Sequence, residues 1–179
     1  MNVILDSNEI TKTLRRLSHE VIENYVDLSK LVIVGIVSRG EFLAKRIHDI
    51  IYQIEKVDVP YGYLDVTLYR DDLDKRKALK PSKSSKIPNI DKKDVLLVDD
   101  VLHEGRTIRA ALDAIKDFGR PESVKLLALI DRLSKKLPIS ADFIGKSIKT
   151  NSNQKVRVYM TEVDNKDCIE VLDEVKSKI

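Results

Sequence analysis

The fold of this chain is decided by the stretch Val95-Leu96-Leu97-Val98-Asp99-Asp100-Val101-Leu102-His103-Glu104-Gly105-Arg106-Thr107. Its four leading apolar residues predict a strand buried on both faces, and the turn after the acidic pair opens a helix predicted over residues 107–118. The N-terminus of a helix directs backbone N–H groups at such a turn, which makes an anion site suited to phosphate. The carboxylates of Asp99 and Asp100 suit instead the vicinal hydroxyls of a sugar, or a Mg²⁺ ion. Phosphate and diol together indicate a ribose 5-phosphate ligand.

An acidic pair after an apolar strand is not specific by itself. It occurs in many α/β proteins, including the receiver domains of response regulators. A receiver carries its pair at the end of the first strand, whereas Asp99 and Asp100 follow the third strand predicted here. The whole pattern, which ends in Gly105-Arg106-Thr107, is far more restrictive than the pair alone.

Strands alternate with helices along the rest of the chain, which predicts an α/β fold with a parallel sheet in a single domain over 1–179. Ser7 or Asn8 is the predicted cap of a first helix, and residues 131–154 are expected to be irregular. Further strands are predicted at 31–36, 61–69, 124–130 and 155–160, and further helices at 42–54 and 165–178.

The bulk composition restricts the function classes. The chain has 179 residues and a net charge of +3, which does not by itself require a nucleic-acid partner. No apolar run approaches the roughly 20 residues that span a bilayer, and the N-terminus has no signal-peptide pattern. The single cysteine, Cys168, excludes an internal disulfide and suits a reducing compartment. We therefore expect a cytoplasmic protein without a membrane partner.

The segment from Val95 to Thr107 resembles the phosphoribosyl-pyrophosphate (PRPP) signature of type I phosphoribosyltransferases. The whole chain resembles the PyrR family, whose members are pyrimidine-operon attenuation proteins and uracil phosphoribosyltransferases. The resemblance runs nearly end to end and is carried by blocks at 3–6, 35–40, 65–73, 119–121, 131–132 and 137–146. It implies a mostly parallel central sheet flanked by helices, a flexible flap at about 70–93 and a small hood at about 131–156.

The resemblance also implies an activity, the transfer of a phosphoribosyl group from PRPP to uracil to give UMP and pyrophosphate. Mg²⁺ would be carried by PRPP near Asp99 and Asp100, with no direct protein ligand. Those two carboxylates would contact the ribose hydroxyls, and Arg70 would contact pyrophosphate. The implied PRPP and UMP site comprises Ser38, Arg39, Gly40, Asp99, Asp100, His103, Glu104, Gly105, Arg106 and Thr107.

Three segments have their own parts in the implied site. Ser38-Arg39-Gly40 would be the pyrophosphate loop, where Arg39 supplies charge and Gly40 permits a close backbone approach. The lysine-rich flap would close over the site and exclude water from the reaction. Backbone groups near Lys155 and Val156 would read uracil, although the hood could equally be an ordinary surface subdomain.

Glu104 departs from the family pattern, which has Thr at this position of the phosphate loop. If the carboxylate points inward, its repulsion would lower the affinity for PRPP by about one to three powers of ten. Alternatively it turns to solvent, or it pairs with a cation such as Arg106 or a flap lysine. We hypothesise that Glu104 lowers phosphoribosyl transfer relative to a threonine.

The resemblance further implies a surface that binds pyrimidine-operon leader mRNA. The matching residues are Arg15, Arg16, His19, Lys135 and Lys146. The family has Gly-His-Arg where this chain has Leu133-Ser134-Lys135, and it commonly has Arg in place of Ser140. Lysine does not reproduce the planar bidentate contacts of arginine, so an ordinary solvated basic face is the alternative interpretation.

Three functions follow from these patterns. The first is a Mg²⁺-dependent uracil phosphoribosyltransferase, and the second is a UMP-responsive RNA regulator with little or no catalysis. A third keeps the fold but uses another base, such as hypoxanthine or orotate, which the blocks at 69–72 and 137–139 argue against. The family implies a homodimer or a higher homo-oligomer, although the apolar helix positions also fit a monomer core.

Overall fold

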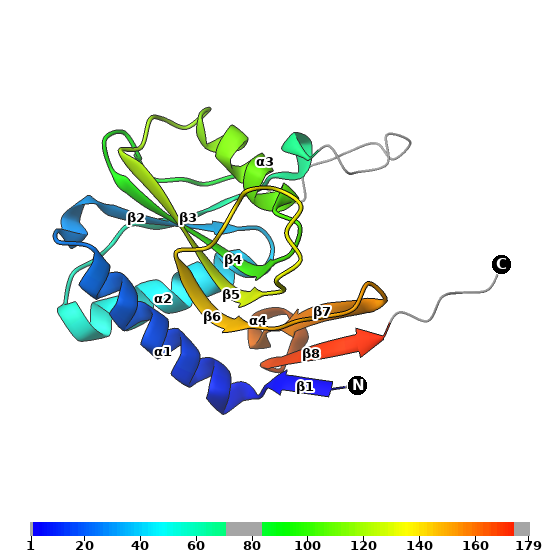
Figure 1. The fold of residues 1–179 in the computed structure, drawn as a ribbon. Helices are drawn as coiled ribbons and strands as arrows, with labels where there is room; N and C mark the ends of the chain where they lie inside the picture. Colours follow the sequence, from blue (N-terminus) through cyan, green and yellow to red (C-terminus); the bar gives the residue numbers. More distant parts are fainter. Residues whose placement is uncertain (1, 71–83, 174–179) are drawn as a thin grey trace.

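The computed structural model describes residues 2–70 and 84–173 and contains two sheets (Figure 1). The larger sheet has the strand order β3-β2-β4-β5-β6, and every pair of neighbours in it is parallel. Its strands are β2 (Leu31–Ile36), β3 (Tyr61–Leu64), β4 (Asp94–Leu102), β5 (Ser123–Asp131) and β6 (Phe143–Ser147). The predicted α/β fold with a parallel central sheet is confirmed.

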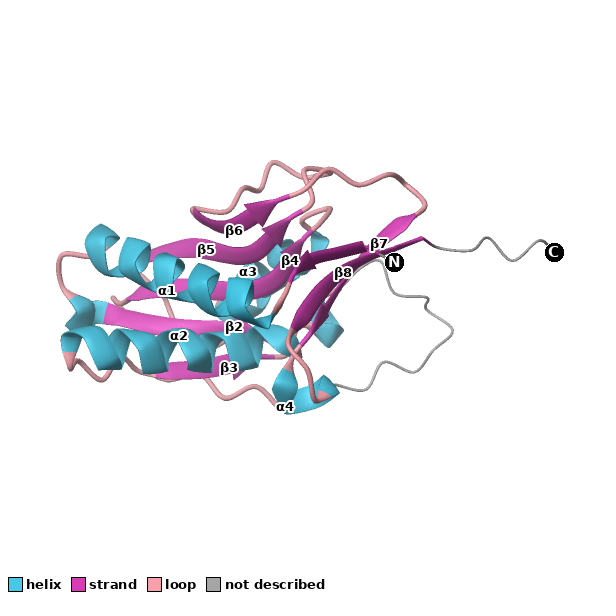
Figure 2. Ribbon diagram, turned by 90° about the horizontal axis from the view of Figure 1, so that it is seen from below, coloured by secondary structure: helices cyan, strands magenta, loops and turns pink. Residues whose placement is uncertain are grey.

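Helices cover both faces of the central sheet. Helices α1 (Ser7–Asn24) and α2 (Arg39–Glu55) lie together across one face, and α3 (Arg106–Ile115) lies on the other (Figure 2). Alternate residues of β2 point to opposite faces, so that Ile33 packs with α1 and α2 whereas Val34 packs with α3. Burial on both faces explains why the sheet strands read as continuous apolar runs.

The N-cap of the first helix lies one residue before the first of its two predicted positions, Ser7. Asp6 is the N-cap, and its side chain accepts a hydrogen bond from the backbone N–H of Glu9, while the Glu9 side chain accepts one from the N–H of Asp6. This reciprocal capping box satisfies two backbone donors that Ser7 or Asn8 could not satisfy together. No helix among residues 2–70 and 84–173 has the length and apolar character needed to cross a bilayer.

The smaller sheet joins the two ends of the described chain. β8 (Cys168–Asp173) pairs antiparallel with both β1 (Asn2–Leu5) and β7 (Gln154–Tyr159). The helix predicted for 165–178 is therefore wrong within the described residues, and 174–178 lie outside them. The segment forms a strand because β1 and β7 pair with it on both sides, although its own sequence pattern is compatible with a helix. The local sequence does not encode this pairing. The irregular structure predicted for 131–154 is also wrong in part, since β6 lies within it.

The segment that leads into the flap differs from its prediction. The strand predicted for 61–69 stops at Leu64, because Oδ1 of Asp65 accepts hydrogen bonds from the backbone and the hydroxyl of Thr67 and bends the chain. Residues 71–83 of the predicted flap lie outside the described residues. From Ser84 onward the chain returns along β3, where Lys86 bridges Tyr63 and Ile90 is fully buried.

Ion pairs attach the smaller sheet to the main domain. α4 (Thr161–Asp164) follows β7 and lies beside α2 (Figure 2). The guanidinium of Arg46, on α2, binds the carboxylates of Glu162 and Asp167 through four hydrogen bonds of 2.6–2.8 Å. Such bidentate pairs fix orientation as well as distance. The smaller sheet thus has a defined position relative to the carboxyl edge of the central sheet.

Candidate active site

The candidate site lies at the carboxyl edge of the central sheet, where β4 ends and α3 begins. Asp99 and Asp100 are on β4, and the loop from His103 to Gly105 leads directly into α3. Gly105 adopts φ of 91°, a conformation that favours glycine, and the side chains of Leu137 and Ile139 lie just beyond its Cα. The loop is therefore packed from outside, while its backbone N–H groups are at the start of the helix.

Burial and mutual repulsion set the electrostatics of the acidic pair. Asp99 is 6% exposed, and one of its carboxylate oxygens accepts the backbone N–H of Asp100 at 2.9 Å. Burial and the neighbouring charge of Asp100 raise the pKa of Asp99, and burial raises the pKa of Asp100 although the Arg39 guanidinium opposes it. Each carboxylate therefore lacks a full counter-charge. Cationic or hydroxyl groups of a ligand would stabilise the negative charges of both.

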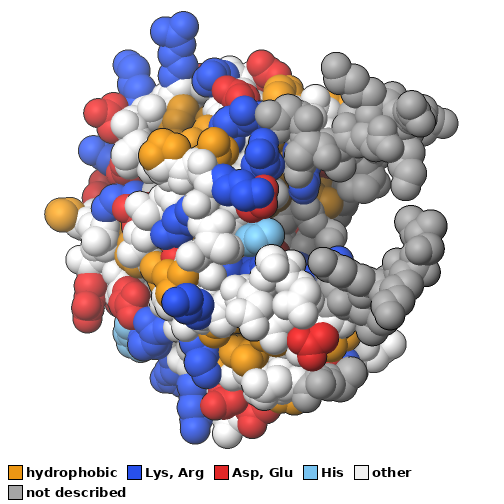
Figure 3. Space-filling model, turned by 45° about the vertical axis from the view of Figure 1, so that its right-hand side comes forward, with side chains coloured by type: hydrophobic (Ala, Val, Ile, Leu, Met, Phe, Trp, Pro, Cys, Tyr) orange, Lys and Arg blue, Asp and Glu red, His pale blue; other side chains and the backbone are white. Residues whose placement is uncertain are grey.

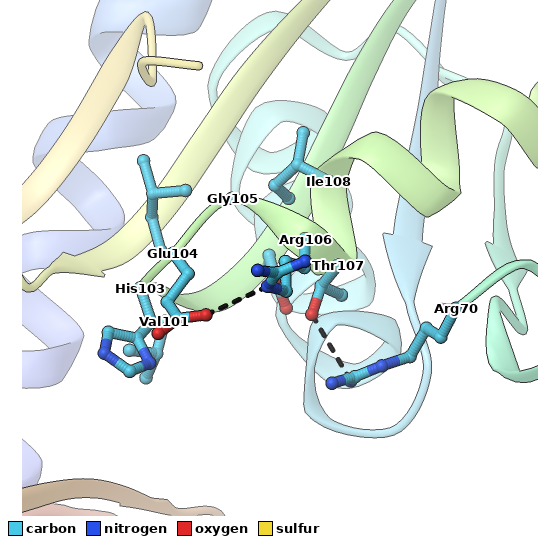
Figure 4. A pocket seen from close by; sticks show the side chains of 10 residues that line it. Arg70, Val101, His103, Glu104, Gly105, Arg106, Thr107 and Ile108 are labelled. Carbon is cyan, nitrogen blue, oxygen red and sulfur yellow. Dashed lines mark hydrogen bonds and ion pairs between the residues drawn. The ribbon is translucent and has the colours of Figure 1, made fainter. Parts of the chain in front are cut away.

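A small cavity of about 80 Å³ is formed by the loop and the first turn of α3 (Figure 4). Its walls include Asp99, Gly105, Arg106 and Thr107, and Arg70, at the first position of the predicted flap, completes them. Nη1 of Arg70 donates to the hydroxyl of Thr107 at 3.4 Å. Backbone donors, a hydroxyl and two guanidinium groups around one small space make a cradle for a phosphate.

Glu104 pairs with cations, one of the three alternatives open from the sequence. One carboxylate oxygen lies 3.0 Å from Nε of Arg106 and the other lies 2.6 Å from Nζ of Lys136. The carbonyl of Glu104 also accepts the backbone N–H groups of Lys136 and Leu137. The bonds to Lys136 and Arg106 hold the pKa of Glu104 below its ordinary value. The carboxylate is thus ionised and shares Arg106 with the phosphate cradle.

The start of α2 brings Arg39 and Gly40 to the same edge of the sheet. A Cβ added to Gly40 would lie 2.5 Å from the carbonyl oxygen of Val98, and one added to Gly35 would lie 2.2 Å from the carbonyl oxygen of Gly40. Gly40 therefore permits a close approach between the first turn of α2 and the backbone of β4. Both oxygens of Asp164 lie 3.1 Å from Nη2 of Arg39, while the buried Nε of Arg39 has no hydrogen-bond partner among the described residues. Ser38, just before α2, is exposed.

A larger cavity of about 560 Å³ opens between the phosphate loop and the segments at 132–136 and 150–155. Lys155 is exposed and lines this cavity, whereas the side chain of Val156 is 8% exposed and packs in the core. The remaining walls are mainly polar: His103, Glu104, Arg132, Ser134, Lys136, Thr150, Asn151, Ser152 and Gln154. Among the residues that the structure describes, no group of three or more His, Cys, Asp or Glu side chains is arranged to hold a metal ion.

The residues matched to RNA binding lie in different local environments. Arg15 and His19 are exposed on α1, whereas Arg16 pairs with Glu20 and donates to the carbonyls of Ile144 and Gly145 on β6. The other two matched residues also have partners: Lys135 pairs with Asp131 at 3.0 Å, and Lys146 donates to the carbonyl of Ile4 at 3.1 Å. Figure 3 shows Lys and Arg side chains spread over one face with acidic side chains among them, rather than one uninterrupted basic patch.

Three residues of the site are not predicted from the sequence. Lys136 closes the Glu104 ion pair, Asp164 holds Arg39, and Arg132 donates to Thr150 and to the carbonyl of Gln154 inside the larger cavity. Spacing gives no signal for such contacts, because their partners are far apart in the chain. The one available signal is chemical: Arg132 follows a buried strand at the sheet edge where ligands bind.

Comparison with known proteins agrees with this geometry. Residues 2–162 match the family model described as a phosphoribosyl transferase domain. The chain is similar to proteins named bifunctional protein PyrR from Synechocystis sp. (48% identical; 94% of this chain and 95% of the relative covered) and from Bacillus cereus (45%; 96% and 97% covered).

Solved structures give the same fold. The hypoxanthine phosphoribosyltransferase of Trypanosoma cruzi superposes with a TM-score of 0.73 at 17% identity, with 98% of each chain covered. That of Staphylococcus aureus superposes with a TM-score of 0.71 at 22% identity, with 98% of this chain and 93% of that chain covered. At these identities the likeness concerns the fold alone. The family match and the close relatives together establish that the chain belongs to the phosphoribosyltransferase-domain family and, within it, to the PyrR family.

Proposed function

We propose that this protein transfers a phosphoribosyl group from PRPP to uracil, giving UMP and pyrophosphate. The proposal is carried by the junction of β4 and α3. There Asp99 and Asp100, whose negative charges lack full counter-charges, lie beside the small cavity that suits a phosphate. The likeness to relatives named bifunctional protein PyrR supports it, since their name fits an enzyme that is also a regulator.

The proposed roles of the chain follow from the chemistry of each group. Backbone N–H groups at the start of α3 and the hydroxyl of Thr107 hold the 5-phosphate. Asp99 and Asp100 accept hydrogen bonds from the ribose hydroxyls. Arg39 and Arg70 stabilise the charge that develops on the departing pyrophosphate. Catalysis then depends chiefly on position and on charge.

Mg²⁺ fits this proposal as an ion carried by PRPP. The carboxylate oxygens of Asp99 and Asp100 are hard ligands of the kind that Mg²⁺ prefers, and their raised pKa values indicate that their charges are not fully compensated by cations. When bound, the ion would supply positive charge at the leaving pyrophosphate. The residues themselves orient the ribose and need no direct bond to the ion.

The proposal is tested with radiolabelled uracil, PRPP and Mg²⁺. We expect labelled UMP to form, and we expect hypoxanthine and orotate to give no product. Absence of UMP from the full-length protein at saturating PRPP would refute the enzymatic proposal. If another base gives product and uracil gives none, the protein is still a phosphoribosyltransferase, but uracil is not its substrate.

We also propose binding of pyrimidine-operon leader RNA, because Arg15 and His19 are exposed on α1 next to the β6 edge that Arg16 contacts. Affinity for a leader hairpin should fall steeply with salt. Arg15→Gln should reduce the slope of log affinity against log salt by about 1. Lys30→Gln, an exposed lysine outside this surface, is the matched control. A salt-independent titration of the wild type would contradict phosphate contacts.

Glu104→Thr should raise kcat/KM for PRPP about fivefold. The incoming 5-phosphate shares Arg106 with the ionised Glu104 carboxylate, and removing the carboxylate removes both competition and repulsion. The factor falls below the range of one to three powers of ten expected for an unpaired carboxylate, because Lys136 already compensates part of the charge. Steady-state kinetics with varied PRPP provide the measurement. Glu104→Gln separates charge from shape and should give most of the gain, whereas equal values for all three proteins would refute the hypothesis.

A further inference from the structure

His103 occupies the boundary between the two cavities of the site. His103 lines both the larger cavity, whose walls also include Lys155, and the small cavity that forms the phosphate cradle. Within the described part of the chain only Glu104 shares this position, and its carboxylate is committed to Arg106 and Lys136. Figure 4 shows the His103 imidazole directed away from the side of the loop that carries Arg106 and Thr107.

The imidazole of His103 is available for proton transfer. It is exposed, and within the described residues it makes no hydrogen bond or ion pair. Its charged surroundings are Glu104 and Lys136 beside it, Arg132 at the end of β5, and Lys155 on β7. Although much of the side chain is exposed, its partial desolvation by the cavity walls lowers the pKa of His103, as does the Arg132 guanidinium, with Lys136 adding to them and Glu104 opposing. The ring is therefore neutral near neutral pH, with one nitrogen able to accept a proton.

The proposed reaction requires such an acceptor. Uracil enters with a hydrogen on N1, and the N1–C1′ bond forms as the bond from C1′ to the pyrophosphate oxygen breaks. The leaving oxygen takes the electron pair of the broken bond. Unless N1 loses its proton, the base in the product would carry a positive charge, so a general base at this position accelerates the forward reaction.

We infer that His103 is the proton acceptor for the base, and that its imidazole takes the N1 proton as the N1–C1′ bond forms. This role rests on the proposed function, since it assigns a group to the same transfer. The N–H bonding pair stays on the uracil ring and the imidazole becomes imidazolium, which releases its proton to solvent. In the reverse direction the imidazolium returns the proton to N1 as the N1–C1′ bond of UMP breaks.

The two directions make the inference testable by pH. UMP synthesis requires the neutral imidazole, so its kcat/KM should fall on the acidic side. Pyrophosphorolysis of UMP requires the imidazolium, so its kcat/KM should fall on the alkaline side. His103→Gln should lower forward kcat about 10²-fold and abolish both limbs. His48→Gln, a histidine on α2 outside both cavities, is the control and should keep the wild-type profiles.

A second substrate separates proton transfer from a structural role. The fluorine of 5-fluorouracil makes the N1 hydrogen more acidic, so the defect of His103→Gln should be clearly smaller with this base than with uracil. An equal defect with both bases, a change in KM alone, or retention of the acidic limb would overturn the role of His103 while leaving the transferase intact. Absence of UMP from the wild type would instead overturn the proposed function, and this role with it.

Discussion

Asp100→Asn should lower kcat/KM for PRPP by about 10²- to 10³-fold and leave the protein folded. The amide keeps the shape of the side chain but cannot present a second acceptor oxygen to a ribose hydroxyl, and it supplies no negative charge beside the developing oxocarbenium-like centre. Steady-state rates of UMP formation provide the measurement. Asp113→Asn is the matched control, because Asp113 pairs with Lys116 on α3 outside the site and its variant should keep wild-type turnover.

The same substitution should raise stability as it lowers activity. Burial raises the pKa of Asp100 above the ordinary 3.8, so the folded state binds this proton more tightly than the unfolded state does. Below the ordinary carboxyl pKa, Asp100 is protonated in both the folded and the unfolded state and does not destabilise the protein. As pH rises towards the folded-state pKa, its ionisation lowers the free energy of unfolding, and this destabilisation persists at higher pH. Removing the Asp100 charge also relieves Asp99, whose pKa is raised in part by that charge.

Thermal denaturation at several pH values tests this linkage. At neutral pH we expect Tm of Asp100→Asn to exceed the wild-type value by about 2–4 °C, and at strongly acidic pH we expect no difference. A variant that is less stable at neutral pH would show that the carboxylate forms a net favourable contact in the free protein.

Gly40→Ala should destabilise the protein and weaken pyrophosphate binding. The new methyl group would lie 2.5 Å from the carbonyl oxygen of Val98, a backbone atom that cannot rotate away, so the first turn of α2 must shift. Overpacking of this kind costs about 1–3 kcal/mol, which for a chain of this length lowers Tm by about 2–12 °C. Arg39 moves with the same turn.

Two measurements distinguish the two effects of Gly40→Ala. Calorimetry gives the loss of stability, and kinetics well below Tm should still show a higher KM for PRPP because Arg39 is displaced. Gln53→Ala, an exposed site on the same helix, should change neither quantity. An unaltered Tm for Gly40→Ala would mean that β4 and α2 can separate at this point without cost.

The core of the site could be predicted from sequence because it is local. Strand, acidic pair, glycine and helix start lie within 95–107, so their chemistry and their geometry are encoded in consecutive residues. The two ion pairs of Glu104 differ in whether the sequence predicts them. Pairing with Arg106, two residues away, is among the alternatives that the sequence allows, whereas pairing with Lys136 depends on how a distant loop packs.

Long-range pairing accounts for the errors in the last part of the chain. The segment 165–173 has a charged, partly apolar pattern that is compatible with a helix, and only the strands on either side of β8 make it a strand. The hold of Asp164 on Arg39 likewise joins residues separated by more than a hundred positions. Neither hydrophobic period nor motif spacing encodes such contacts, because both describe neighbours in sequence.

The pairing of the first strand with the last has a consequence for synthesis. β1 is synthesised before its partner β8, which follows only after nearly all of the described chain. The parallel sheet can form in the meantime, while β1 waits with unsatisfied backbone groups. The smaller sheet is therefore completed last, after the junction of β4 and α3 that forms the small cavity. Variants that slow release of the final segment should lengthen exposure of this unpaired edge, with aggregation rather than misfolding of the core as the outcome.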